Sequence, residues 1–218
     1  MSDTVLQRKN GGTAPARPVK PGGKRAQIKA TNRQAILTAA REVFAELGFG
    51  ATTVRDIIRR TGLASGTFYN YFRSKEEVFE AIMDDNALSV RPRLHEARVH
   101  ASTLEEFVRE TFLVFFDFCV TDRGAYAVMR RNSGQMRVRM DTPEVIAGFD
   151  ELRADLEAAI AKGLAPPVDA GFLTASLIGI AFEIADEMFR REPFDAEAAA
   201  EFATALFLGG VEALPRTG

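Results

Sequence analysis

The stretch TVRDIIRRTGLASGTFYNYFRSKEE, residues 53–77, predicts two short helices joined by a tight turn and the first turn of a third helix. Thr53 and Asp56 fit the capping-box spacing, in which each side chain bonds an otherwise unpaired backbone amide at a helix start. The helix that they open meets Gly62, and glycine adopts the left-handed conformation of a helix end at little steric cost. A second short helix is predicted over residues 65–72. Two short helices joined by a few residues that include glycine form a helix-turn-helix pattern.

Two further predicted helix starts frame this pattern. Thr31 and Gln34 have the capping-box spacing and predict a helix that ends at Gly48. Ser74 and Glu77 have the same spacing and predict a longer helix after the pattern. The three helices before that point carry apolar residues at helical spacing. Their predicted common core consists of Ile36, Phe44, Leu47, Val54, Ile57, Leu63, Phe68 and Phe72. A core of this size is marginally stable by itself.

Charge is unevenly distributed along the chain. The 218 residues have a formal net charge of −2 and are 46% hydrophobic, which is enough for one small and one larger domain. Residues 1–75 hold 14 Lys and Arg against 4 Asp and Glu. Residues 141–218 hold 5 basic residues against 15 acidic ones. A basic head on an acidic body indicates a polyanionic partner for the head alone.

The cysteine count and the apolar segments bear on the compartment. Cys119 is the one cysteine, so the sequence has neither a disulfide framework nor a cysteine-based zinc site, which fits a reducing cytosol. The N-terminus lacks the apolar region of a signal peptide. The most apolar segment, residues 172–184, is interrupted by polar side chains and is too short to cross a bilayer. We therefore expect a cytoplasmic protein that does not enter the membrane.

The N-terminal residues 1–28 are rich in Gly, Pro, Thr and basic residues and lack an apolar period, so a disordered basic tail is predicted. Lys20, Lys24, Arg25 and Lys29 lie just before the first predicted helix. Basic residues at this place have two interpretations: an arm that follows a phosphate backbone or enters a minor groove, and a solvated tail without such a contact.

The chain after Lys75 has helical patterns and no alternating strand pattern, so the predicted fold class is all-α. Pro92 removes an amide donor and clashes with the preceding turn, so we expect a kink or break near residues 90–91. Thr142 and Pro143 form a further helix start, with proline at the first helical position. The predicted helices of this part cover residues 75–100, 102–120, 126–129, 143–162, 169–191 and 196–214.

Four pieces of sequence follow one another at fixed spacing: Glu-Leu-Gly-Phe at 46–49, Thr-Thr-Val-Arg-Asp-Ile at 52–57, Gly-Leu-Ala-Ser-Gly-Thr-Phe-Tyr-Asn-Tyr-Phe at 62–72 and Ser-Lys-Glu-Glu at 74–77. Together they resemble the DNA-binding domain of the tetracycline-repressor (TetR) type of regulator; only the combination is specific. The resemblance implies a ligand-responsive transcription factor, in most cases a repressor, that binds palindromic operator DNA as a homodimer.

The same resemblance implies a domain organisation. Residues 1–28 would be the disordered basic tail, residues 29–74 the helix-turn-helix DNA-binding domain, and residues 75–218 a helical ligand-binding and dimerisation domain. The last two long helices would form the four-helix bundle of a homodimer. A ligand in the larger domain would move the helix that begins at Lys75, and Pro92 would let its upper half move separately.

Mapped residue by residue, the resemblance places Thr53 and Lys75 at helix N-termini that contact phosphates, a task that free amides and the helix dipole favour. Gly66 and Thr67 match the start of the recognition helix, and Tyr69 matches a phosphate-contacting tyrosine. The whole set expected to contact DNA is Thr53, Arg55, Ser65, Gly66, Thr67, Tyr69, Asn70, Tyr71 and Lys75.

Two positions depart from the family pattern, Ala64 and Ser65, and at the second of them a longer polar residue is frequent. Ala64 stands where serine is common, and Ser65 is expected to take over the cap of the recognition helix. An isolated polar side chain on a helix is more often a solvated residue than a DNA contact. The joint spacing favours DNA contacts for Thr53, Thr67, Tyr69 and Lys75. For Asn70 and Arg55 both interpretations stay open.

The predicted larger domain is rich in phenylalanine, and most of these side chains are expected to be core. Some are predicted to line an elongated apolar cavity between helices, beside a loop whose cations receive an anionic head group. The candidate ligand-binding residues are Phe112, Phe115, Phe116, Arg130, Phe149, Ile178 and Phe182. The run Phe-Phe-Asp-Phe followed by Arg-Gly-Ala-Tyr also resembles, more weakly, TetR-type regulators of fatty-acid metabolism. That resemblance implies a small hydrophobic effector such as a fatty acid or an acyl-CoA.

Glu183 and Asp186 interrupt the apolar face of a predicted helix. A buried charge needs a partner, so they are expected to pair with Arg190 or with the partner subunit. The functional alternative is that they bind a cationic or aromatic drug-like compound.

Other chemistries find little support in the sequence. Residues 62–66 are not a G-x-S-x-G nucleophile elbow, because no strand precedes them. His95 and His100 are five residues apart, not the four that align two metal ligands on one helix face. No catalytic residue, metal site or cofactor is predicted. The competing classes are a helical enzyme and an adaptor that does not bind DNA. An enzyme would be indicated by converging acidic and histidine residues, which the sequence lacks. A gel-shift assay would distinguish an adaptor from a DNA-binding regulator.

Overall fold

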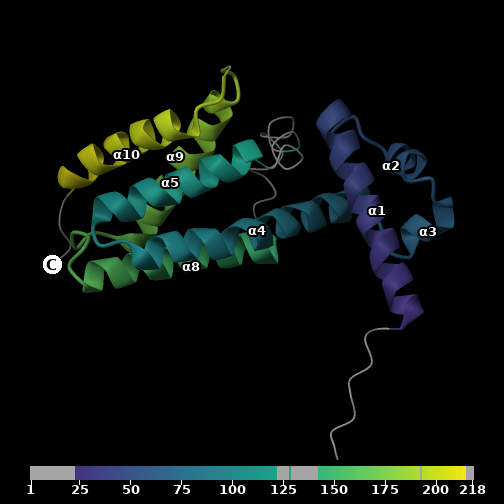
Figure 1. Ribbon diagram of the computed structural model, residues 1–218, viewed down its shortest axis with the longest axis horizontal. Helices are drawn as coiled ribbons and strands as arrows, with labels where there is room; N and C mark the ends of the chain where they lie inside the picture. Colours follow the sequence, from purple (N-terminus) through teal and green to yellow (C-terminus); the bar gives the residue numbers. More distant parts are fainter. Residues whose placement is uncertain (1–22, 122–127, 129–141, 192, 215–218) are drawn as a thin grey trace, which may run out of the picture.

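The computed structural model describes residues 23–121, 128, 142–191 and 193–214. Within these ranges the chain forms helices and no strands, which confirms the all-α fold class. The helices are α1 (Lys24–Leu47), α2 (Val54–Thr61), α3 (Ser65–Tyr69), α4 (Lys75–His100), α5 (Leu104–Thr121), α8 (Pro143–Ala161), α9 (Ala170–Met188) and α10 (Ala196–Glu212). Figure 1 shows α1 to α3 at one end, a bundle of later helices at the other, and α4 running between them.

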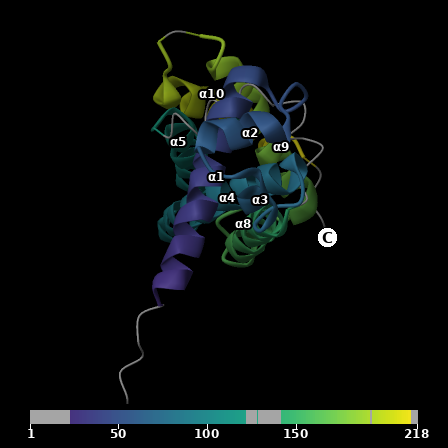
Figure 2. The ribbon, with the colours of Figure 1, turned by 90° about the vertical axis from the view of Figure 1, so that its right-hand side faces the viewer.

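The first three helices pack around a small apolar core. Phe44 of α1, Ile57 of α2 and Phe68 of α3 are each at most 1% exposed. The start of α4 contributes Phe79, whose ring centroid lies 5.3 Å from that of Phe44 and 5.0 Å from that of Phe49. The first turns of α4 therefore belong to the same core as the helix-turn-helix. Viewed end-on in Figure 2, α2 and α3 lie in front of the bundle.

α1 begins earlier than predicted, at Lys24 rather than after Thr31. The Thr31 hydroxyl does not cap a helix; it donates to the backbone oxygen of Gln27, 2.9 Å away, inside the helix. A threonine can bond the carbonyl four residues before it as readily as it caps, so the capping-box spacing alone does not fix a helix start. The assignment of residues 24–28 to a disordered tail was wrong, whereas residues 1–22 lie outside the described residues.

The caps of the helix-turn-helix follow the prediction in part. Thr53 and Asp56 form the expected capping box, with the Asp56 amide 3.3 Å from the Thr53 hydroxyl oxygen and the Thr53 amide 3.0 Å from the Asp56 carboxylate. Gly62 ends α2 in the left-handed region at φ 67°. The expectation for α3 was wrong: Ala64 is its N-cap, no side chain caps it, and the helix ends at Tyr69 instead of residue 72.

α4 is one continuous helix from Lys75 to His100 with Pro92 inside it, so the expected break near residues 90–91 was wrong. Proline removes one backbone hydrogen bond. Packing against α5 along one side and α8 along another replaces that support. Its start is capped by Ser74, which accepts from the Glu77 amide at 3.3 Å, while the Glu77 carboxylate accepts from the Arg73 amide at 2.6 Å.

The bundle consists of α5, α8, α9, α10 and the C-terminal part of α4. α8 begins at Pro143, as predicted, but Thr142 does not cap it with its side chain. Asp84 of α4 instead accepts from the Glu144 amide at 3.0 Å. The predicted helix through residues 126–129 and the loop that follows it lie, except for the helical residue Val128, outside the described residues.

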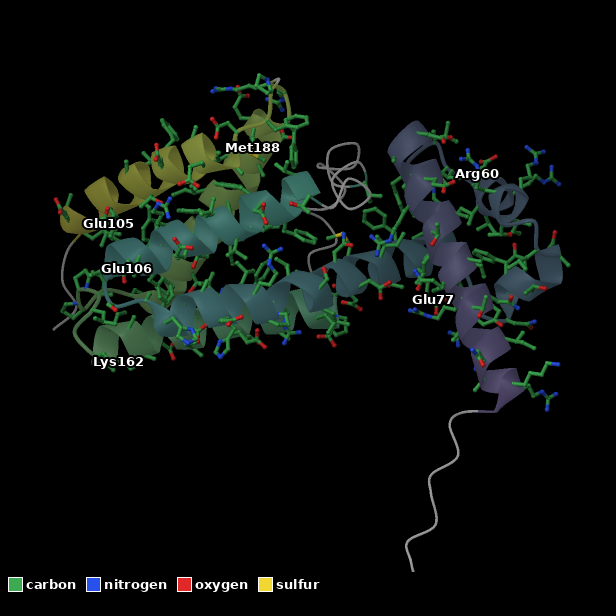
Figure 3. All side chains as sticks on the ribbon, in the orientation of Figure 1. Arg60, Glu77, Glu105, Glu106, Lys162 and Met188 are labelled. Carbon is green, nitrogen blue, oxygen red and sulfur yellow. The ribbon has the colours of Figure 1, made fainter. Side chains whose placement is uncertain are left out.

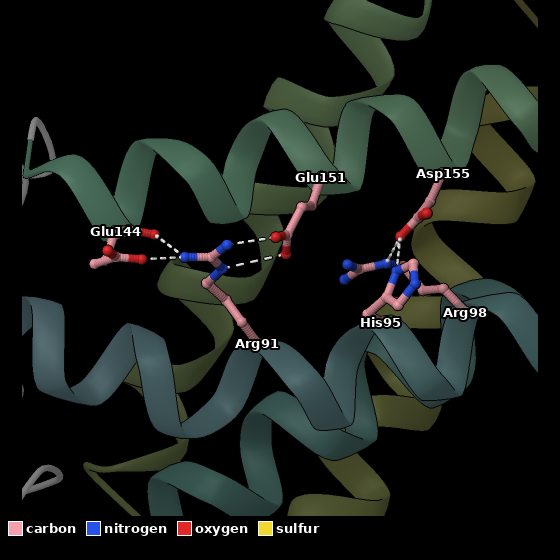
Figure 4. A network of polar contacts seen from close by, with 6 residues as sticks. All are labelled: Arg91, His95, Arg98, Glu144, Glu151 and Asp155. Carbon is pink, nitrogen blue, oxygen red and sulfur yellow. Dashed lines mark hydrogen bonds and ion pairs between the residues drawn. The ribbon is translucent and has the colours of Figure 1, made fainter. Parts of the chain in front are cut away.

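A row of ion pairs joins α4 to α8 (Figure 4). Arg91 donates to the carboxylates of Glu144 and Glu151, and its Nε lies 3.2 Å from Glu151. Two turns further on, Arg98 donates to Asp155 at 2.7 Å, and its side chain is only 3% exposed. A buried guanidinium without its partner would be strongly destabilising, so this row fixes α8 against α4.

The row makes the stability of the fold dependent on pH. The hydrogen bonds from Arg91 lower the pKa of Glu151 below its ordinary value of 4.5. A carboxylate with a lowered pKa in the folded state stabilises the fold above the unfolded pKa, and this stabilisation is lost as the pH falls through the folded pKa. We expect the thermal stability of Glu151→Gln to fall less steeply below pH ~5 than that of the wild type. Equal slopes for both proteins in melting curves across the acid range would contradict the assignment.

Candidate functional site

The outer face of the helix-turn-helix carries most of the residues expected to contact DNA. Thr53, Arg55, Ser65, Gly66, Tyr69 and Asn70 are exposed, and Thr67 and Tyr71 are half-buried. Tyr69 is 60% exposed although it is large and aromatic, and its ring packs edge-on against Phe68 at 5.3 Å. The buried Phe68 thus holds an exposed tyrosine in place at the end of α3. DNA contact by these residues stays a prediction.

Lys75 makes contacts within the protein that the sequence did not indicate. Its Nζ donates to the backbone oxygens of Phe49 at 2.7 Å, Thr52 at 2.8 Å and Gly50 at 3.3 Å. It also lies 4.6 Å from the centre of the Phe49 ring. An ammonium group has three donors, so all three are used on the loop between α1 and α2. The side chain therefore ties the start of α4 to that loop, and contact of this helix start with a phosphate stays a prediction.

Arg60 of α2 forms ion pairs with α1. It donates to Glu46 at 2.7 Å and to Glu42 at 3.1 Å, both on α1, and these bonds lower the pKa of Glu46. Figure 3 labels Arg60 where α2 lies beside α1. The residues next to Arg60 in the sequence give no sign of these pairs, because the partners lie 14 and 18 residues earlier in the chain. Exposed pairs of this kind contribute little to stability, but they orient one helix on another.

An apolar cavity of about 140 Å³ lies between α4, α5, α8 and α9. Phe112 and Phe115 of α5, Phe149 of α8, and Ile178 and Phe182 of α9 line it, as predicted. Phe115 and Phe182 meet with their ring centroids 5.4 Å apart. These five predicted residues, from three helices, come together around one space.

Two predicted ligand residues do not fit this cavity. Phe116 stacks on Phe112 at 5.9 Å but is 0% exposed and does not line the space. Residues 112, 115 and 118 lie on the side of α5 that faces the cavity. Phe118 therefore lines the cavity, whereas Phe116 packs in the core. Arg130 lies outside the described residues.

The prediction missed the wall that α4 provides. Met83, Ala87, Val90 and Leu94 line the cavity at helical spacing, together with the polar residues Asn86, Arg91 and Arg98. The signal in the sequence was an asparagine on the apolar stripe of a long helix. Arg91 and Arg98 are both held by carboxylates of α8, whereas Asn86 is 7% exposed and bonds α1 through Arg41.

The acidic residues considered as a site for a cationic compound do not line the cavity. Asp186 pairs with Arg190, as expected. Glu183 is exposed on α9. Among the described lining residues the one acid is Glu144, and Arg91 holds it. The cavity therefore presents apolar surface and guanidinium groups instead of free negative charge.

Reactive groups are few in the described part of the chain. Burial raises the pKa of the Cys119 thiol, which makes it a poor nucleophile. His95 lies 3.3 Å from Asp155, and His100 faces its own helix at the Glu96 carbonyl. No cluster of metal-binding side chains occurs among the residues described, and none of their helices is long and apolar enough to span a bilayer.

A helix-turn-helix with an exposed basic and aromatic face, joined by α4 to a helical domain with an apolar cavity, is the layout typical of DNA-binding transcriptional regulators. The family model described as bacterial regulatory proteins, tetR family, matches residues 36–82. Residues 36–82 of the chain therefore form a domain of the type found in bacterial regulatory proteins of the tetR family.

Solved structures share the fold across most of the chain. The fatty acid degradation regulator FadR from Bacillus halodurans is 22% identical with a TM-score of 0.71 and covers 88% of this chain and 98% of its own. The transcriptional regulator FadR from Bacillus subtilis, in complex with stearoyl-CoA, is 23% identical with a TM-score of 0.69, over 82% and 98%. A TetR family regulator from Marinobacter aquaeolei VT8 is 21% identical with a TM-score of 0.63, over 83% and 97%. At these identities the similarity shows the fold.

The different settings of Tyr69 and Lys75 lead to opposite expectations. Tyr69→Ala should weaken binding to operator and unrelated DNA alike, with the melting temperature unchanged, because an exposed residue is lost that positions the protein on the backbone. Lys75→Met should lower the unfolding free energy by about 1–3 kcal/mol, because three carbonyls lose a charged donor. Fluorescence anisotropy with both DNAs and chemical denaturation measure the two effects. An unstable Tyr69→Ala or a fully stable Lys75→Met would contradict these roles.

Proposed function

We propose that the protein is a cytoplasmic homodimeric repressor that binds palindromic operator DNA and is released by a fatty acid or acyl-CoA. The cavity carries this proposal, because its walls are apolar on all four helices and it opens beside guanidinium groups. Such a lining suits an alkyl chain with a polar or anionic end. The fold shared with a regulator in complex with stearoyl-CoA supports the same class of effector.

The size of the cavity suggests how the effector acts. Its 140 Å³ is below the roughly 300–1,000 Å³ of sites that enclose drug-sized ligands. A long acyl chain therefore fits only if the helices around it move apart. A ligand that binds the expanded arrangement better than the closed one shifts the protein toward it. Because α4 forms one wall and continues into the helix-turn-helix core, expansion moves the DNA-binding domain.

A homodimer would place two recognition helices in successive major grooves, about 34–36 Å apart. The face that α9 and α10 leave open supports such a dimer. Phe172 on α9 is 77% exposed, and Phe202 and Leu206 on α10 are 61% and 54% exposed. Large apolar side chains on two adjacent helices are typical of a surface that another chain covers.

The effector class is tested by filling the cavity. Ala181 lines the cavity on α9, so Ala181→Phe should occupy part of it and lower the affinity for long-chain acyl-CoAs about tenfold or more. DNA binding without effector should stay within about twofold of the wild type. Ala154→Phe, at an exposed position of α8, is the matched control and should behave as wild type.

Titration calorimetry and a gel shift with the DNA upstream of the protein's own gene measure both quantities. If no fatty acid or acyl-CoA binds the wild type or releases this DNA, the effector class is wrong. If the DNA itself is not bound, this operator is wrong.

The dimer is tested on α10. Phe202→Glu places a charge on the proposed interface and should yield a monomer with greatly weakened operator binding. Leu88→Glu makes the same kind of change at a 53% exposed residue of α4, away from that face, and should leave the dimer intact. Light scattering during size-exclusion chromatography distinguishes the species. A dimeric Phe202→Glu protein would contradict this interface.

A further inference from the structure

Asn86 occupies an unusual place on α4. Its side chain lines the cavity and is 7% exposed. Its Oδ1 accepts a hydrogen bond from Nη1 of Arg41 on α1, at 2.6 Å. Its Nδ2 is fully buried, and among the described residues it has no hydrogen-bond partner. One end of the carboxamide therefore bonds the helix that leads to the DNA-binding core, and the other end has an unused donor.

The orientation of this carboxamide follows from chemistry. An arginine has only donors, so the atom that faces Arg41 must be the amide oxygen. The free end is then the NH2 group, which can only donate. A buried donor without an acceptor is costly, and buried polar groups that lack a partner call for an explanation. Because Asn86 lines a cavity, an acceptor atom of a bound ligand would explain its unpaired donor.

Few other fully buried polar atoms in the described part of the chain lack a partner. Three fully buried side-chain atoms of the described residues lack a partner, namely Asn86 Nδ2, Thr142 Oγ1 and Thr204 Oγ1. Of these three residues only Asn86 lines the cavity. Thr111 also lines it, but its hydroxyl donates to the Phe107 carbonyl at 2.6 Å. Among the fully buried side-chain atoms of the described lining residues, Asn86 Nδ2 is thus the one donor without a partner.

We infer that the Asn86 amide is the donor that fixes an acceptor oxygen of the effector, the carbonyl or carboxylate oxygen at the polar end of its alkyl chain. This inference rests on the proposed function, since it takes the cavity as the effector site. It assigns one hydrogen bond that distinguishes an oxygen-bearing chain from a plain hydrocarbon of the same length.

The same side chain connects the effector with the DNA-binding domain. Arg41 bonds Asn86 and also lies 3.6 Å from Asp85, so one guanidinium links α1 to two consecutive residues of α4. A carboxamide is rigid, so turning its NH2 group toward an effector oxygen also displaces the oxygen that Arg41 holds. Binding of the effector therefore weakens the link between α1 and α4. Asn86 is a ligand-binding residue in this scheme, and Arg41 is a positioning residue.

The variant Asn86→Asp separates the two ends of the side chain. It keeps an acceptor for Arg41 and removes the unpaired donor at the other end of the side chain. We expect its affinity for stearoyl-CoA to fall about tenfold. Its affinity for S-octadecyl-CoA, a thioether of equal chain length without the carbonyl, should equal that of the wild type. Thr111→Val, which removes a hydroxyl already bonded within α5, is the control and should bind both ligands normally.

The link to α1 is tested with Arg41→Met. We expect this variant to bind stearoyl-CoA within twofold of the wild type but to release operator DNA less completely at saturation. Arg93→Met, which breaks the pair between Arg93 and Asp117 of α5 about two turns further along α4, is the matched control and should release DNA as the wild type does.

The outcomes distinguish this inference from the proposed function. If neither fatty acids nor their CoA thioesters bind the wild type, the effector class fails and the inference fails with it. If they bind the wild type and Asn86→Asp equally well, the inference alone is overturned. An equal loss of both CoA ligands in Asn86→Asp also overturns it, because the loss would then not depend on the carbonyl.

Discussion

One helix shared by two hydrophobic cores is the constraint on which the rest of the structure depends. The first turns of α4 pack Val78, Phe79 and Ile82 into the helix-turn-helix core, and each of the three is 0% exposed. Further along, Val90 and Leu94 form a wall of the cavity. A packed interior transmits displacement because it has few voids. The match to the tetR family model extends to residue 82, so the matched segment includes the part of α4 that enters this core.

Two polar groups fix how α4 meets the DNA-binding domain. Lys75 holds the loop between α1 and α2 through three carbonyls, and Arg41 holds Asn86 three turns further along. On its opposite end α4 is fixed to α8 by Arg91 and Arg98. The helix is thus tied to both of the parts that it separates. Motion of the bundle relative to the helix-turn-helix has to change one of these sets of bonds.

Much of this could be predicted from the sequence, because local chemistry determines it. The capping box of Thr53, the glycine end of α2 and the apolar spacing of the later helices depend on residues close in the chain, and the structure has all three. The motif at 46–77 indicated the family for the same reason. Five of the seven candidate ligand residues also line one cavity, since a helix face can be read from its period.

Several of the features that the sequence did not reveal involve partners that are distant in sequence. The bonds from Lys75 to the loop between α1 and α2 could not be predicted, because the carbonyls that it bonds lie more than 20 residues away. The unbroken α4 at Pro92 depends on packing against α5 and α8. Asn86 could be read as a polar residue in an apolar stripe, but only the fold shows that Arg41 occupies one end of it. Phe116 lies outside the cavity because of the way α5 is rotated about its axis. The spacing of the aromatic residues along the sequence does not determine that rotation.

The central claim is that effector binding beside α4 changes the separation of the two recognition helices in the dimer. A spin label at Arg59→Cys tests it directly, since the Arg59 side chain is 70% exposed on α2 and the native Cys119 is buried. Pulsed electron resonance then gives the distance between the two labels. We predict that saturating stearoyl-CoA shifts this distance in the wild-type background and leaves it unchanged with Ala181→Phe. The same distance with and without effector, under conditions in which the effector releases operator DNA, would contradict the account.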